Sequence, residues 1–116
     1  MSEAIKILVV DDELSIRVSL QGWLKKFGYR VDTAEDGETA LNLAEETFYD
    51  LMLVDIKMPG MDGIEVLRQI KGDSPDTLVV MITAHGSIES AVESMKIGAS
   101  DYLMKPFDPK QLELLL

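Results

Sequence analysis

The stretch ILVVDD at residues 7–12 joins four aliphatic residues directly to two aspartates. The stretch LMLVD at residues 51–55 has the same form and ends on a third aspartate, and YLMK at residues 102–105 ends on a lysine. Short aliphatic runs that alternate with helical patterns are typical of buried parallel strands. These stretches therefore predict an α/β protein built on a parallel sheet.

The charged residues that end these runs are Asp11, Asp12, Asp55 and Lys105. In a doubly wound sheet the carboxyl ends of the strands form the ligand crevice, so we expect the four side chains to converge there. Three carboxylates about 5 Å apart repel one another by roughly 3 kcal/mol per pair at an effective dielectric constant of about 20. A bound cation or a functional need would offset this repulsion, which makes the crevice the candidate site.

Strand and helix patterns alternate along the whole sequence. Strands are expected at residues 5–10, 31–34, 51–54, 78–82 and 102–104. Four groups of apolar residues have helical spacing and are expected to face the core: Ile16, Leu20, Trp23, Leu24 and Phe27; Ala40, Leu41, Ala44 and Phe48; Ile64, Leu67 and Ile70; Ile88, Ala91, Val92 and Met95. Asp62 and Ser87 are expected to cap the third and fourth helices, and Gly28 and Gly98 to end the first and fourth.

Five strand–helix units with short links predict a doubly wound, five-stranded parallel sheet inside a three-layer α/β/α sandwich with right-handed crossovers. A length of 116 residues suits one domain. A fifth helix is expected to open near Pro109, and the sequence stops inside its pattern. We therefore expect residues 1–116 to be one domain cut from a longer protein within this helix, whose apolar residues 112–116 form half of a face.

The composition excludes several classes of function. Apolar residues make up 47% of the chain and charged residues 28%, which is typical of a folded, soluble domain. The net charge is 11 − 21 = −10, so the domain is expected to bind neither nucleic acid nor anionic membranes. The absence of cysteine excludes disulfides and thiolate metal sites and fits the cytoplasm. Residues 1–10 have the pattern of neither a signal peptide nor a membrane span.

The three aspartates suggest phosphoryl chemistry. Their carboxylates are hard oxygen ligands suited to Mg²⁺, Mn²⁺ or Ca²⁺, and Mg²⁺ is often completed by a phosphate oxygen. Asp55 is the best candidate nucleophile because the loop after it leaves it open, and a carboxylate that attacks phosphorus forms an aspartyl phosphate. Asp11 and Asp12 are then metal ligands, directly or through water, and the main-chain carbonyl of Lys57 is a further candidate ligand.

Phosphoryl transfer also needs groups that contact the equatorial oxygens of the transferred group. Lys105 can supply a fixed cation, and the hydroxyl of Thr83, at the end of the fourth expected strand, can supply a hydrogen bond. Each site residue also has an ordinary reading when taken alone. Asp11 or Asp12 could cap the first helix, Asp55 could be a turn aspartate, and Lys105 a surface lysine. None of these readings explains why all of them lie at strand ends.

Four motifs together resemble a response-regulator receiver domain of two-component signalling. They are VVDDE at residues 9–13, DIKMPGMDG at 55–63, ITA at 82–84 and KPF at 105–107. The order and spacing agree with the family over essentially the whole chain. The sequence from residue 82 to 107 is most similar to receivers of sigma-54-dependent, nitrogen-regulator-like transcriptional activators.

The resemblance implies a flavodoxin-like fold with strand order 2-1-3-4-5. It also implies phosphorylation of Asp55 by a sensor histidine kinase, dependence on Mg²⁺, and a domain that assists its own phosphorylation and dephosphorylation rather than acting as an enzyme on other substrates. Transcription would then be controlled through downstream domains.

The resemblance also suggests how a signal would leave the site. Thr83 and an aromatic residue, here Tyr102, would form the switch, and the face of the fourth helix, fifth strand and fifth helix would form a homodimer. Lys57 and His85 flank the expected path of attacking water and could tune the phosphate lifetime. The peptide bond between Lys105 and the following proline is expected to be cis.

Three alternatives use parts of this pattern. A phosphatase of the haloacid-dehalogenase type also forms an aspartyl phosphate, but it needs two aspartates separated by one residue, whereas Asp11 and Asp12 are adjacent. A flavodoxin-like cofactor binder would need a Ser/Thr/Gly phosphate loop where this chain has Asp-Asp-Glu. A receiver that has lost phosphorylation would lack a key residue, and none is missing. The phosphoacceptor switch is therefore favoured.

Overall fold

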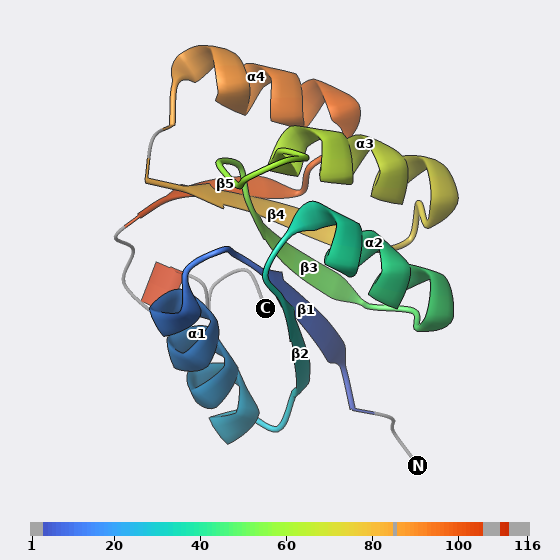
Figure 1. Ribbon diagram of the computed structural model, residues 1–116, viewed down its shortest axis with the longest axis vertical. Coiled ribbons are helices and arrows are strands. Elements are labelled where there is room, and N and C mark those ends of the chain that lie inside the picture. Colours follow the sequence, from blue (N-terminus) through green and yellow to red (C-terminus); the bar gives the residue numbers. More distant parts are fainter. Residues whose placement is uncertain (1–3, 85, 106–109, 112–116) are drawn as a thin grey trace.

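The computed structural model describes residues 4–84, 86–105 and 110–111. Within these residues five strands alternate with four helices (Figure 1). The strands are β1 (Lys6–Val10), β2 (Arg30–Ala34), β3 (Leu51–Asp55), β4 (Leu78–Thr83) and β5 (Asp101–Met104). The helices are α1 (Leu14–Lys26), α2 (Gly37–Glu46), α3 (Gly63–Asp73) and α4 (Ile88–Ile97). Every strand and the first four helices expected from the sequence are present.

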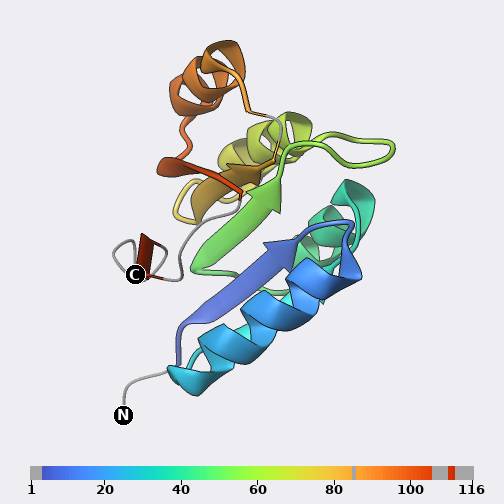
Figure 2. The same ribbon diagram turned by 90° about the vertical axis from the view of Figure 1, so that its left-hand side faces the viewer.

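The strands form one parallel sheet in the order β2-β1-β3-β4-β5, which confirms the predicted topology. The arrows of β1 and β3 point the same way in Figure 2. Register pairs Val10 with Val54 and Asp55 with Ile82, so β1, β3 and β4 end side by side. The carboxyl ends of the central strands therefore carry their polar residues to one edge of the sheet.

Helices cover both faces of the sheet (Figure 1). Ile7 and Val9 of β1 point to the face covered by α1, where Leu24 is buried. Leu8 and Val10 point to the opposite face, which is covered by α2 and α3. Alternate residues of a strand point to opposite faces, so a continuous aliphatic strand is the expected sequence when both faces are buried. This confirms the three-layer α/β/α arrangement.

The helix termini mostly follow the sequence signals. The carboxylate of Asp62 accepts from the N–H of Glu65 at the start of α3 (3.0 Å), and Ser87 and Ser90 cap the start of α4 reciprocally. Gly28 and Gly98 have φ angles of 88° and 125°, a region that favours glycine. The interpretation of Asp11 or Asp12 as the cap of α1 was wrong. The cap position is Glu13, whose side chain makes no capping bond.

Two aromatic residues expected in the core are exposed. Phe27 and Phe48 are each 53% exposed. Both lie beyond the last residue of their helix, because α1 ends at Lys26 and α2 ends at Glu46. Helical spacing therefore does not determine whether these two side chains are buried.

The face of α4 that was predicted to point inward points outward instead. Ile88 is 84% exposed, and Val92 and Met95 are about half exposed. The face that packs contains the small residue Ser94, which is fully buried, and the partly buried Ile97. The small side chain of Ser94 lets the helix backbone approach its neighbours closely at this point.

Several predictions lie outside the described residues. These are the position of His85, the isomer of the bond that follows Lys105, the start of a fifth helix at Pro109 and the face formed by residues 112–116. Across the residues that the structure does describe, no helix has the length and apolar character needed to cross a membrane.

Candidate functional site

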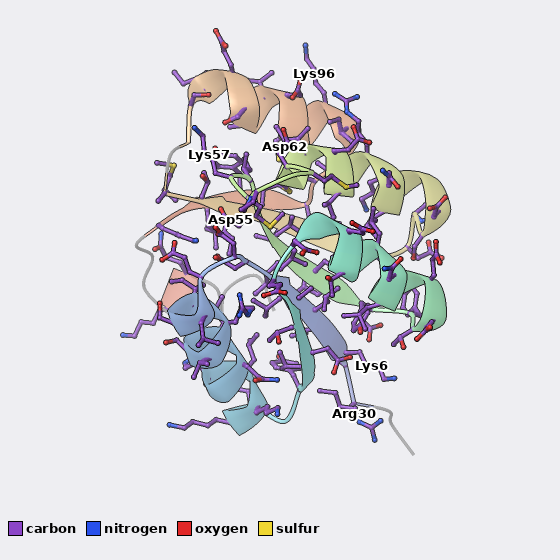
Figure 3. The ribbon with its side chains drawn as sticks, in the orientation of Figure 1. Lys6, Arg30, Asp55, Lys57, Asp62 and Lys96 are labelled. Atoms are coloured by element: carbon purple, nitrogen blue, oxygen red, sulfur yellow. The ribbon has the colours of Figure 1, made fainter. Side chains whose placement is uncertain are left out.

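Three aspartates meet at the carboxyl ends of β1 and β3. Asp11 and Asp12 follow β1 and Asp55 ends β3, and one carboxylate oxygen of each lies within 4.8 Å of the others. Figure 3 shows Asp55 with Lys57 and Asp62 at this end of the sheet, while Lys6 and Arg30 lie at the opposite end. The predicted convergence of the carboxylates is confirmed.

Lys105, which follows β5, reaches into this cluster. Its Nζ atom donates to Oδ2 of Asp11 at 2.6 Å and lies 3.6 Å from Oδ2 of Asp55. A third carboxylate, that of Glu13, lies 3.8 Å away. The main-chain N–H of Lys105 donates to the carbonyl of Thr83 (2.8 Å), which fixes the base of the side chain beside the end of β4. The cation is therefore held among three carboxylates and is almost buried.

The main-chain and side-chain polar groups of Asp11 are all hydrogen-bonded. Its carbonyl accepts from Arg17 (2.8 Å), and its N–H donates to the carbonyl of Ala34 (3.1 Å). One carboxylate oxygen accepts from the N–H of Glu13 (2.9 Å) and the other accepts from Lys105. Asp11 is fully buried, whereas the neighbouring Asp12 is exposed. The two adjacent aspartates therefore differ in role: Asp11 positions Lys105, and Asp12 faces solvent, where a cation can reach it.

Burial and charge perturb the two central groups. Burial, followed by the negative charge of Asp11, raises the pKa of Asp55 to about 6, with Asp12 adding to the effect and Lys105 opposing it. Burial acts to lower the pKa of Lys105, but the hydrogen bond and charge of Asp11, with the charges of Asp55 and Glu13, outweigh it and raise that pKa. Ionised Asp55 is thus held in an unfavourable environment that an additional cation would relieve.

A groove of about 420 Å³ opens next to the carboxylates. It is lined by Asp12, Ile56, Lys57, Met58, Pro59 and Asp62. Clustered carboxylate oxygens beside an open, partly polar groove fit a hard divalent cation that keeps several water ligands. The residues present could therefore hold a metal ion of this class.

The loop that lines the groove depends on a close contact at Gly63. Its N–H donates to the carbonyl of Ile56 (2.8 Å), and a Cβ atom at this position would overlap the main-chain carbonyl of Asp55. Glycine therefore lets α3 begin directly against the end of β3. Neither this contact nor the roles of Glu13 and Arg17 were predicted from the sequence. Glu13 and Gly63 each lie in a motif, VVDDE and DIKMPGMDG, whereas Arg17 lies in none.

The predicted switch residues both lie close to Gly86. Thr83 is fully buried at the end of β4, and Tyr102 is half-buried on β5. A Cβ atom on Gly86 would lie 3.1 Å from Cγ2 of Thr83 and would overlap the hydroxyl of Tyr102. The Tyr102 hydroxyl shares a hydrogen bond with the Ser90 hydroxyl of α4 (2.9 Å). Thr83 and Tyr102 therefore both border the space that a side chain at position 86 would occupy.

Comparison with known proteins agrees with this fold. Residues 7–116 match the family described as response regulator receiver domain, and the chain belongs to this family. It is a signalling domain of two-component response regulators, with the doubly wound, flavodoxin-like fold that the sequence predicted. The adjacent aspartates and the binding of Asp11 by Lys105 give no support to the haloacid-dehalogenase alternative.

Several relatives cover almost the whole chain. Transcriptional regulatory protein ZraR of Klebsiella oxytoca is 47% identical over 98% of this chain and 26% of its own length. Chemotaxis protein CheY4 of Vibrio cholerae has a TM-score of 0.91 at 36% identity, over 97% of this chain and 96% of that one. The beryllofluoride-activated NtrC4 receiver domain dimer has a TM-score of 0.89 at 41% identity, over 94% and 90%. The nitrogen-regulator-like resemblance is confirmed, and the chain spans about a quarter of the length of ZraR.

Proposed function

We propose that Asp55 accepts a phosphoryl group from the phosphohistidine of a sensor histidine kinase. The observation that supports this most strongly is the placement of the Asp55 carboxylate 3.6 Å from the Lys105 cation and within 4.8 Å of the carboxylates of Asp11 and Asp12, of which Asp12 lines an open groove. A free carboxylate oxygen of Asp55 would attack phosphorus while the bond to the imidazole nitrogen breaks and the imidazole takes up a proton. Proximity and electrostatics supply most of the catalysis in such a transfer.

The other site residues would hold the transferred group. Lys105 lies 3.6 Å from Asp55 and would contact a phosphoryl oxygen, with the Thr83 hydroxyl contacting another. Asp12 and Asp55, with Asp11 and the main-chain carbonyl of Lys57, would hold Mg²⁺, or Mn²⁺ in its place, and the bound ion would neutralise charge on the phosphoryl oxygens.

The same residues would assist hydrolysis of the aspartyl phosphate, so the domain takes part in both its phosphorylation and its dephosphorylation. Lys57 is exposed on the wall of the groove, where it can control the approach of water, and we assign His85 a similar role. These two residues would tune how long the phosphoryl group persists.

Output would pass from Thr83 through Tyr102 to the exposed face of α4. We propose that this face, with β5 and the fifth helix, forms a homodimer in the longer protein, and the beryllofluoride-activated NtrC4 relative is itself described as a receiver dimer. Control of transcription would lie in segments that the ZraR-like relatives have beyond this domain. With a net charge of −10 the domain itself would contact neither nucleic acid nor membrane, and it would act in the cytoplasm, where the kinase finds ATP.

Intact-mass measurement after treatment with acetyl phosphate and Mg²⁺ tests this proposal. One phosphoryl group should be added to the wild-type chain and none to Asp55→Asn. Asp62→Asn is the matched control, because Asp62 lines the same groove but caps α3, and it should still be phosphorylated. The same adduct in Asp55→Asn, or an adduct that forms equally well in EDTA, would contradict the proposal.

A further inference from the structure

The hydroxyl of Tyr102 is held from two sides. On one side it shares the 2.9 Å hydrogen bond with Ser90, in the first turn of α4. On the other side it occupies the space that a side chain on Gly86 would fill. We propose that Ser90 and Gly86 are positioning residues for Tyr102, and that the Ser90–Tyr102 bond joins the switch to α4. The functional part of this inference rests on the proposed phosphoacceptor function.

Ser90 is suited to this role because its hydroxyl also organises the start of α4. It donates to the carbonyl of Ser87 (3.1 Å) and accepts from the N–H of Ser87 (3.1 Å). Ser90 therefore belongs at once to the cap of α4 and to the contact with Tyr102. Movement of the Tyr102 hydroxyl would alter the hydrogen bonding of the first turn of the helix.

The absence of a side chain at Gly86 leaves the space that the Tyr102 hydroxyl occupies. A Cβ atom here would overlap both the Tyr102 hydroxyl and Sδ of Met104. Because both contacts are with the far ends of side chains, Gly86→Ala would displace these groups rather than unfold the loop. Alanine at this position should therefore drive the Tyr102 hydroxyl away from Ser90.

The position of the pair connects the site to the surface of α4. Tyr102 pairs with Met81 of β4, two residues before Thr83, whereas Ser90 lies in the first turn of α4, which also carries the exposed residues Ile88 and Val92. A Tyr102 ring that moved into space vacated by Thr83 would leave Ser90. The bond therefore opposes this movement, and its removal should make the switch easier to drive.

Fluorine NMR of the chain labelled with 3-fluorotyrosine tests the contact directly, because the sequence contains only three tyrosines. Ser90→Ala should shift the resonance of Tyr102 and leave those of Tyr29 and Tyr49 in place. Ser90→Thr, which keeps a hydroxyl, should restore the shift towards wild type. Ser87→Ala removes the cap of α4 without removing the Ser90 hydroxyl, and should have the smaller effect on Tyr102. An unmoved Tyr102 resonance in Ser90→Ala would overturn the inference.

Titration with beryllofluoride and Mg²⁺ tests the functional consequence. Ser90→Ala and Tyr102→Phe should each lower the half-saturating beryllofluoride concentration by roughly two- to tenfold, the range expected for one net hydrogen bond. The double variant should show no more than the larger single effect, since both changes remove the same bond. Additive effects of the two changes, or higher half-saturating beryllofluoride concentrations in the variants, would overturn the inference.

Failure of the wild-type chain to respond to beryllofluoride would instead refute the proposed function. The fluorine shifts in the free domain would still report the Ser90–Tyr102 contact.

Discussion

The carboxylate site and helix α4 both reverse the usual pattern of burial, in opposite ways. At the site, Asp11, Asp55 and Lys105 are charged and nearly buried. On α4, Ile88 and its apolar neighbours are exposed, while Ser94 is buried with a hydroxyl that has no hydrogen-bond partner among the residues that the structure describes. Charged groups are ordinarily exposed and unpaired hydroxyls are rarely buried.

The difference between the two regions indicates what each one would bind. The site compensates its buried charges internally, through the contacts of Lys105 and Asp11, and leaves a net negative cluster that a cation and a phosphoryl group would complete. On α4 the large apolar side chains Ile88, Val92 and Met95 are exposed rather than covered by the residues that the structure describes. The site is therefore suited to small ions, whereas α4 presents the apolar surface that we propose as a contact with another molecule.

Replacement of the two adjacent aspartates should give the largest contrast. Asp11→Ala removes a buried partner of Lys105 and should lower the free energy of unfolding by about 3 kcal/mol. Asp12→Ala removes only an exposed charge from a repelling cluster and should leave stability unchanged or slightly increased. Urea unfolding in EDTA, followed by Trp23 fluorescence, measures both. Equal losses in the two variants would contradict the distinct roles of these residues.

Asp55→Asn should stabilise the metal-free domain at neutral pH. The folded pKa of Asp55 is raised to about 6, above an unfolded value of about 3.9. Between these values the folded state binds more protons, so wild-type stability falls as pH rises from about 4 to about 6 and is constant above. The variant should therefore gain about 3 kcal/mol at pH 7, and the gain should vanish near pH 4.

Urea unfolding of both proteins across this pH range, in EDTA, measures the effect. Asp76→Asn is a suitable control, because Asp76 is exposed in the turn before β4. A gain that was the same at pH 4 and pH 7 would show that charge on Asp55 is not its cause.

Ser94→Ala should stabilise the domain by about 1 kcal/mol, since it removes a buried hydroxyl that finds no partner within the described part of the chain. Thermal unfolding compares it with Ser100→Ala, in which the hydroxyl lost is exposed and little change is expected. A destabilised Ser94→Ala variant would mean that this hydroxyl does have a partner, and that the packed face of α4 is more complete than the structure indicates.

The smallest effect is expected on the exposed face of α4. Val92→Thr should change the free energy of unfolding by less than about 0.5 kcal/mol. The same exchange at Val66, buried on α3, should cost about 1–3 kcal/mol, because the new hydroxyl enters the core. Chemical denaturation of the two variants makes the comparison. An equal cost at both positions would contradict the outward orientation of α4.

The site was predictable from the sequence because polarity changes abruptly at each strand end. Asp11 and Lys105 are 94 residues apart in the chain, yet the rule that parallel strands end at one edge brings them together. The orientation of α4 was not predictable in this way. Helical periodicity identifies an apolar face, but it does not show whether that face is buried within the same chain or exposed.

The contacts that sequence reasoning missed are those without a local pattern. Arg17 binds a main-chain carbonyl, and the Ser90–Tyr102 bond joins two residues whose separation carries no periodic signal. Gly63 directly follows the predicted cap Asp62, but its close approach to Asp55 depends on how α3 meets β3. Such contacts follow from packing in three dimensions rather than from residue order.

We propose that a phosphoryl group on Asp55 acts on α4 through Thr83 and Tyr102, and hydrogen–deuterium exchange of the wild-type chain with and without Mg²⁺ and beryllofluoride tests this coupling. Exchange should change in α4 and β5 as well as in the loops that follow β1 and β3, whereas α2 should be unaffected and Asp55→Asn should show no response. Changes confined to the loops around the site, or the same changes in Asp55→Asn, would refute the coupling.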